Sequence, residues 1–188
     1  MKTAYSLIKS FENQPGLETA FAPSKSRSSL KFSLYPEGIP LGALTQILGA
    51  GSTEAILRLF SEYPEEKMAW VEERFTAYPP GFVQGGANLN GLLFVESGEH
   101  FAWALTQILR SQLFKVVVAA SALRGDGVEL RLKRLQLAAE HSQSALILAA
   151  ECEGPLWPLR LRLQARQEEG RLILTQREDS IQIKEAIS

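Results

Sequence analysis

Short apolar runs alternate with helical patterns along most of the chain, from Tyr35 onward. The continuous apolar runs at 116–120 and 145–149 are typical of strands that are covered on both faces of a sheet. Residues 98–110 and 127–141 have the i, i+3/i+4, i+7 apolar spacing of helices with one buried face. This alternation predicts βαβ units, and therefore an α/β fold with a mainly parallel central sheet. The predicted core positions are Phe101, Ala104, Leu105 and Ile108 in the first helix and Val128, Leu132, Leu135 and Ala139 in the second.

The pattern changes near the C-terminal end, after the segment 154–158. Apolar and polar residues then alternate strictly, a turn signal follows at 168–170, and an apolar segment returns at 171–175. This predicts an antiparallel hairpin at one end of the sheet, with one buried face and one solvated face. The buried face would carry Leu159, Leu161, Leu163 and Ala165, and the solvated face Arg160, Arg162, Gln164 and Arg166.

Both ends of the chain differ from the central domain, which we place at residues 30–178. Residues 1–29 form an N-terminal arm, with a short amphipathic helix at 4–12 and a polar tract that is too poor in apolar residues to fold alone. One interpretation is a disordered tail and linker. The other is an oligomerisation arm, in which the alternating segment 30–34 docks as a strand on a neighbouring copy. Residues 179–188 are expected to be a loose tail.

A phosphate-binding loop is missing where the pattern places one. The buried strand at 45–49 ends in Gly49, and a helix is predicted to begin near residue 52. A G-x-x-x-x-G-K-[ST] motif starting at Gly49 needs Gly, Lys and Ser or Thr at positions 54–56, but the chain has Glu54, Ala55 and Ile56. The lysine and the magnesium-binding hydroxyl are both absent, and Glu54 would repel phosphate. The sequence therefore predicts no ATP binding and no nucleotide cofactor.

The segments around this loop resemble the core of the RecA family. Residues 38–49 resemble the approach to its first core strand, 68–73 its second strand, 92–110 its next strand and helix, and 115–121 its Walker B strand. The resemblance implies a three-layer RecA-like domain. It places Glu73 at the position of the water-activating glutamate and Ala120 where an aspartate would help to hold Mg²⁺. Since both nucleotide elements are degenerate, we expect no catalytic residue and interpret the chain as a non-enzymatic derivative of an ATPase scaffold.

Among such scaffolds the chain resembles the ImuA family most, over residues 30–178. The residues that carry this resemblance are 132–140 (LKRLQLAAE), 159–163 (LRLRL) and 172–177 (LILTQR). The resemblance implies a role in SOS-induced, error-prone translesion DNA synthesis, as an adaptor that binds the polymerase homologue ImuB and RecA. Self-association is a further expectation, and DNA contact is expected to be weak or indirect. The alternative is a SulA-like inhibitor of cell division that binds FtsZ.

Charge and composition restrict the remaining functions. Of the 188 residues, 20 are Lys or Arg and 21 are Asp or Glu, so a net charge of −1 gives no overall attraction to nucleic acid. Cys152 is the only cysteine, and His100 and His141 lie far apart in the sequence, which argues against a structural metal site. No apolar run is long enough for a membrane span and no signal-peptide core is seen. We therefore expect a cytoplasmic protein with no metal and no membrane partner.

The arginines of the predicted hairpin are the strongest candidates for a partner surface. Arg160, Arg162 and Arg166, joined by Arg171, are either the solvated face of an edge hairpin or a contact surface for an acidic partner or DNA backbone. A second basic cluster, Arg124, Arg131, Lys133 and Arg134, is partly offset by Glu129.

The segment 75–90 is the second candidate for a partner surface. Tyr78 and Phe82 stand beside prolines and glycines in a predicted loop. Exposed aromatic side chains in such a loop would suit a protein contact. The alternative is that the loop folds back and packs both aromatic rings on its own domain.

Overall fold

The computed structural model of the protein describes residues 28–150 and 158–177. The predicted helix at 4–12, most of the polar tract, Cys152 and the tail at 179–188 lie outside these residues. In the part that is described, no helix is both long and apolar enough to span a lipid bilayer.

The centre of the fold is a seven-stranded sheet in the order β5-β4-β6-β7-β3-β8-β9. Neighbouring strands are parallel throughout, except that β8 and β9 form an antiparallel hairpin. The strands are β3 (Ala43–Leu48), β4 (Met68–Glu72), β5 (Leu92–Glu96), β6 (Val116–Ala119), β7 (Ala145–Leu148), β8 (Leu161–Glu168) and β9 (Arg171–Gln176). The predicted fold class is therefore confirmed: an α/β domain with a mainly parallel sheet and a C-terminal antiparallel hairpin.

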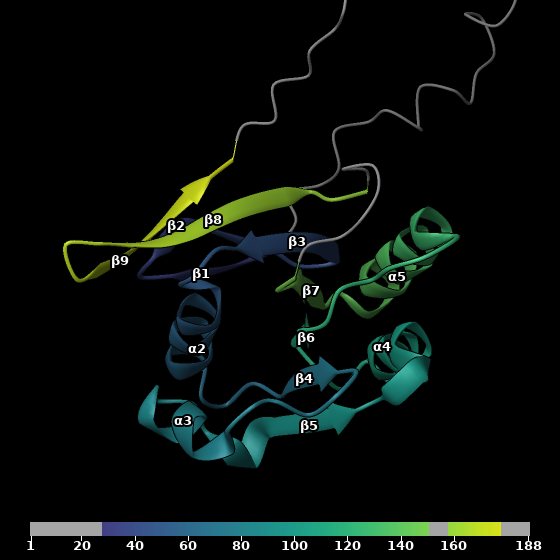
Figure 1. Ribbon diagram of the computed structural model, residues 1–188, viewed down its shortest axis with the longest axis horizontal. Coiled ribbons are helices and arrows are strands. Elements are labelled where there is room, and N and C mark those ends of the chain that lie inside the picture. Colours follow the sequence, from purple (N-terminus) through teal and green to yellow (C-terminus); the bar gives the residue numbers. More distant parts are fainter. Residues whose placement is uncertain (1–27, 151–157, 178–188) are drawn as a thin grey trace, which may run out of the picture.

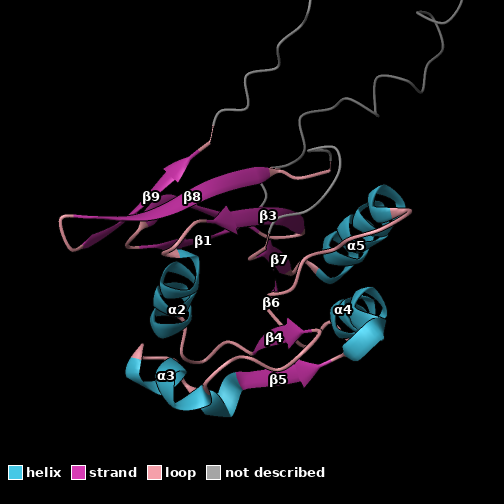
Figure 2. Ribbon diagram, viewed as in Figure 1, coloured by secondary structure: helices cyan, strands magenta, loops and turns pink. Residues whose placement is uncertain are grey.

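Helices cover both faces of the sheet (Figures 1 and 2). One face packs against α2 (Ser52–Glu62) and the short helix α3 (Pro79–Gln84), and the other packs against α4 (Phe101–Arg110) and α5 (Val128–Ser142). The 3-10 turns η2 (Leu89–Gly91) and η3 (Gly98–His100) lead into β5 and α4. This three-layer arrangement explains the continuous apolar runs of β6 and β7, whose residues are all buried.

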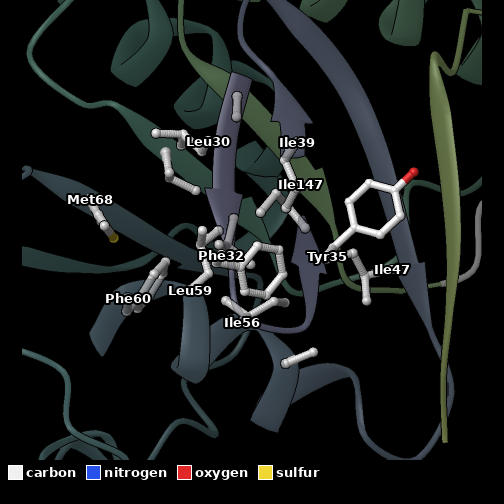
Figure 3. Close-up of a cluster of buried hydrophobic side chains, with 14 of the residues drawn as sticks. Leu30, Phe32, Tyr35, Ile39, Ile47, Ile56, Leu59, Phe60, Met68 and Ile147 are labelled. Atoms are coloured by element: carbon white, nitrogen blue, oxygen red, sulfur yellow. The ribbon is translucent and has the colours of Figure 1, made fainter. Parts of the chain in front are cut away.

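The core on the α2 side joins distant parts of the chain (Figure 3). α2 contributes a buried stripe, and the central strands contribute inward-facing residues such as Ile47 and Ile147. A two-stranded antiparallel sheet, β1 (Ser29–Phe32) with β2 (Tyr35–Pro40), covers this cluster and adds Leu30, Phe32 and Ile39. The segment 30–34 is thus largely a strand, as predicted, but its partner is β2 of the same chain. Both large side chains of β1 are buried in the domain's own core, which argues against its docking on a neighbouring copy.

On the opposite face, the predicted core stripes of α4 and α5 are largely as expected. All four predicted positions of α5 are buried, together with Ala138. In α4, Leu109 is buried in place of Ile108, which is only partly buried. The difference is a small rotation of the buried stripe around the helix.

The predicted hairpin turn is tight. Glu169 and Gly170 both have positive φ, 51° and 76°, and Glu168 pairs directly with Arg171. Positive φ at both central residues is the geometry of a two-residue type I′ turn, which suits the twist of the flanking strands. On β8, the predicted positions Leu161, Leu163 and Ala165 are buried.

Candidate functional site

The turn between β3 and α2 occupies the place of the expected phosphate-binding loop. Gly49, Ala50 and Gly51 are the only residues between the end of β3 and the start of α2. The Ser52 backbone N–H donates to the Gly49 carbonyl at 3.0 Å, which closes the turn, and Gly49 has a φ of +102°. The first turn of the helix therefore begins too early for a longer phosphate cradle.

The C-terminal hairpin packs directly on this turn. A Cβ atom at Gly49 would overlap the backbone carbonyl of Ala165, and one at Gly51 would overlap a methyl group of Leu172. Gly51 is buried. Because not even a methyl group fits on these sides of the two glycines, the hairpin and the β3–α2 turn are closely packed.

The three residues that replace the motif are placed for folding. Glu54 lies in the first turn of α2, where its carboxylate suits the helix dipole, and it accepts a 2.9 Å hydrogen bond from Nε2 of Gln167 in β8. Ala55 and Ile56 are fully buried in the core. The positions at which the motif has Lys and Ser or Thr therefore face the interior of the domain.

Glu72 is a buried carboxylate at the end of β4. It accepts hydrogen bonds from the Thr76 and Ala77 backbone N–H groups at 2.7 and 3.0 Å, and from the Thr76 hydroxyl at 3.0 Å. Burial alone would raise the pKa of Glu72, but these hydrogen bonds outweigh burial and hold the pKa below its ordinary value. The carboxylate thus stays ionised and fixes the turn that follows β4.

The two other Walker-type positions lie at the same edge of the sheet. Glu73 is exposed, and its backbone N–H donates to the Ser121 hydroxyl at 2.9 Å, which ties the ends of β4 and β6 together. Ala120 is partly buried against the α2-side core, and its N–H donates to the Val71 carbonyl. Glu73 therefore has no second carboxylate beside it at position 120, where the chain has an alanine.

The hairpin arginines share one face of the sheet, as predicted from their alternation. Arg160, Arg166 and Arg171 are exposed, whereas Arg162 is partly buried and its Nε donates to Oε1 of the buried Gln46 at 2.9 Å. A carboxylate oxygen of Glu168 lies 3.8 Å from a guanidinium nitrogen of Arg166, and Glu168 is directly opposite Arg171 in the β8–β9 ladder. The exposed arginines are available for contact, but Glu168 offsets part of their charge and Arg162 has a structural role.

The two aromatic candidates in the segment 75–90 differ in their exposure to solvent. The segment contains α3, which begins with Pro79 and Pro80 in its first turn, where proline is tolerated. Tyr78 is 68% exposed, but Phe82 is only 4% exposed and makes edge-to-face contacts with Trp70 and Phe94 at 5.0 and 4.9 Å. The prediction of Phe82 as a contact residue is therefore wrong, because the α3 turn directs its ring into the core.

One surface was missed by the sequence reasoning, namely an open groove between α4 and α5. The residue in the sequence that indicates this groove is Trp103, which lies outside the buried apolar stripe of α4 and is 65% exposed. A large aromatic residue outside the buried stripe of an amphipathic helix is the pattern that would have identified it.

In comparisons with known proteins, neither a protein-family model nor a curated protein matches this chain.

Proposed function

We propose that this protein is a non-catalytic adaptor in damage-induced, error-prone translesion synthesis, where it binds an ImuB-like polymerase homologue and RecA. The observation that carries the non-catalytic part is the packing of the β8–β9 hairpin on the Gly49–Gly51 turn. Close packing of the hairpin on the turn where an ATPase of this type would hold phosphate supports a role in binding rather than in turnover. The mutagenesis context comes from the resemblance of residues 132–140 and of the hairpin to the ImuA family.

The partner surface proposed for this role is the solvated face of the hairpin. Arg166 and Arg171 are exposed there on strands that are hydrogen-bonded into the central sheet, and the exposed Arg160 directly precedes β8, where its backbone N–H donates to the Leu44 carbonyl at 2.9 Å. The backbone positions of all three arginines are therefore fixed. Arginine is enriched in protein interfaces because its planar guanidinium can bind a carboxylate with two hydrogen bonds. Tyr78 is the second exposed candidate.

The test is affinity capture of the tagged full-length chain from cells treated with a DNA-damaging agent, with bound proteins identified by mass spectrometry. We expect to recover a polymerase homologue or RecA with the wild-type chain. This recovery should be lost in the double variant Arg160→Glu/Arg166→Glu and retained in Arg74→Glu. Arg74 is an exposed arginine in the loop after β4, so it controls for charge reversal alone. Recovery of FtsZ instead would replace this proposal with a division inhibitor.

A separate measurement tests the non-catalytic part. We expect no binding of ATP to the wild-type chain in isothermal titration calorimetry, and no phosphate release above a protein-free blank. ATP turnover that survives further purification would contradict the proposal.

A further inference from the structure

The groove between α4 and α5 is an open channel on the outside of the domain, lined by both apolar and polar side chains. The two helices pack side by side on one face of the sheet (Figure 1), and the groove between them has a volume of about 760 Å³. Leu135 and Ala138 of α5 are buried residues of its lining, while Trp103 of α4 and Leu137 of α5 are 65% and 58% exposed. Two large apolar side chains therefore line a groove whose buried lining residues are also apolar.

These exposed residues have no evident role in the fold. The buried stripe of α4 is formed by Phe101, Ala104, Leu105 and Leu109, and Trp103 lies outside it. The Trp103 ring has an edge-to-face arrangement with the His100 ring, with 6.5 Å between the ring centroids. Leu137 likewise lies outside the buried stripe of α5. Contiguous exposed apolar side chains on a folded domain typically mark an interaction site.

The charge of the groove restricts what can bind there. Its charged lining residues are Arg110 from α4 and Arg131 and Arg134 from α5, and no acidic residue is among the described residues that line it. Arg131 is held in place because its guanidinium donates to the carbonyls of residues 124, 125 and 126 at 2.6–3.3 Å. The groove thus combines apolar contact area with fixed and exposed positive charge.

We propose that the α4–α5 groove binds an acidic segment of a partner protein. An apolar side chain of that segment packs between Trp103 and Leu137, and its carboxylates pair with Arg110 and Arg134. Tryptophan and arginine are the residue types that dominate binding energy at protein interfaces. Pairing of arginine with carboxylate supplies direction and specificity.

A protein segment fits this groove better than a nucleic acid strand. Single-strand binding surfaces place several aromatic rings along a basic track, so that successive bases stack on them. Among the described residues that line the groove, Trp103 is the only such ring apart from the imidazole of His141, and leucine and alanine make up the apolar remainder. A peptide segment that carries both an apolar side chain and carboxylates therefore matches this lining better than a run of stacked bases.

This inference does not depend on the proposed mutagenesis role. The groove lies between two helices on one face of the sheet, whereas the proposed adaptor surface lies on the hairpin at the far end of the strand order. The two can be tested by different variants, so the failure of one leaves the other intact.

The experiment uses the full chain and a random peptide library displayed on phage. Peptides selected on the wild type are synthesised with a fluorescent label, and their affinity is measured by fluorescence anisotropy. We expect the enriched peptides to be acidic with at least one large apolar residue. We also expect Trp103→Ala and Arg134→Glu each to weaken binding about tenfold or more, as for interface hot spots.

Matched controls separate the groove from a general effect of the substitutions. Arg58→Glu reverses an exposed charge on α2, on the opposite face of the sheet, and Leu113→Ala removes an exposed apolar side chain beyond the end of α4. Both should retain wild-type affinity for the selected peptides. Because Trp103 and Arg134 are exposed, their variants should keep the wild-type circular dichroism spectrum.

Several outcomes would overturn the proposal. Enriched peptides that are basic or uncharged, or that bind all variants equally, would exclude an acidic ligand in this groove. Tighter binding of a labelled oligothymidine than of any peptide, lost in the same variants, would assign the groove to nucleic acid. A change of oligomeric state in Trp103→Ala, measured by sedimentation, would assign it to a second copy of the chain.

Discussion

Gln167 of β8 donates a 2.9 Å hydrogen bond from Nε2 to Oε2 of Glu54 in the first turn of α2. The two residues are far apart in the sequence, and their hydrogen bond joins the hairpin to the first turn of α2. Next to this bond, Leu172 packs on Gly51 and the Ala165 carbonyl packs on Gly49. The β3–α2 turn and the hairpin therefore form one packed unit.

Substitution of Gly49 should reveal how tightly the turn is packed. Gly49→Ala places a methyl group against the Ala165 carbonyl at a φ of +102°, so we expect a loss of about 2–3 kcal/mol in the free energy of unfolding. The measurement is urea denaturation followed by circular dichroism. Gly98→Ala is the control, because Gly98 also has a positive φ but has no atom within 4 Å of the added methyl group. It should cost only about 1 kcal/mol, and equal losses would contradict this description of the turn.

Phe82 and Tyr78 should behave in opposite ways. Phe82→Ala removes a buried ring that contacts Trp70 and Phe94, and we expect it to destabilise the domain by about 3–5 kcal/mol. Tyr78→Ala removes an exposed ring, so its effect should stay within about 0.5 kcal/mol. Thermal unfolding of the two variants decides the matter, and a stable Phe82→Ala variant would mean that α3 is not packed on β4 and β5 as described.

The hairpin arginines should differ in their contribution to stability. Arg162→Ala removes the donor to the buried Gln46 oxygen, and we expect a loss of about 1–3 kcal/mol. Arg160→Ala, on the same face but exposed, should be nearly neutral in the same urea titration. If both substitutions are neutral, the Arg162–Gln46 bond does not stabilise the sheet. The prediction also means that Arg162 variants are poor probes of partner binding.

Glu72 should give the domain an acid-dependent stability. Its folded-state pKa lies below the ordinary value of 4.5, so its contribution is fully present above that value and is lost as the pH falls through the folded-state pKa. Glu72→Gln removes this ionisation and should cost about 1–2 kcal/mol near neutral pH. The difference between wild type and variant should shrink as the pH falls below about 4.

The measurement for Glu72 is a series of urea titrations across this pH range. Glu73→Gln is the matched control, since Glu73 is the exposed neighbour of Glu72 and should show no such change. A Glu72→Gln variant whose stability difference is the same at all pH values would show that ionisation of Glu72 is not coupled to folding.

Local patterns were sufficient to predict most of the elements of this fold. The strands β6 and β7 are continuous apolar runs because both of their faces are covered, and the stripes of α4 and α5 follow from helical spacing. The alternation of Leu161, Leu163 and Ala165 gave the buried face of β8 because a strand has a period of two. These signals lie within one element, so a single sequence carries them.

Features that depend on contacts between distant residues could not be predicted in the same way. Prolines and glycines flank both Tyr78 and Phe82 in the sequence. In the structure α3 begins between them, at Pro79, so that Tyr78 precedes the helix and is exposed, whereas Phe82 lies within it and is buried. Nothing local to Leu30 and Phe32 shows that β2, rather than a neighbouring copy, is their partner. The contact between the hairpin and the Gly49–Gly51 turn joins segments more than a hundred residues apart. The groove between α4 and α5 forms only where the two helices pack side by side, so the sequence pattern of either helix alone does not predict it.

The pairing of β3 with β8 also has a consequence for the synthesis of the chain. β3 is an inner strand of the finished sheet, yet both of its partners, β7 (145–148) and β8 (161–168), are made long after its own residues. While the ribosome adds the intervening segment, the nascent domain has an open edge along β3 and uncovered apolar residues such as Ile47. Completion of this domain must therefore wait until the hairpin emerges. A shortened chain that ends before the hairpin would lack the strand that pairs with the second edge of β3.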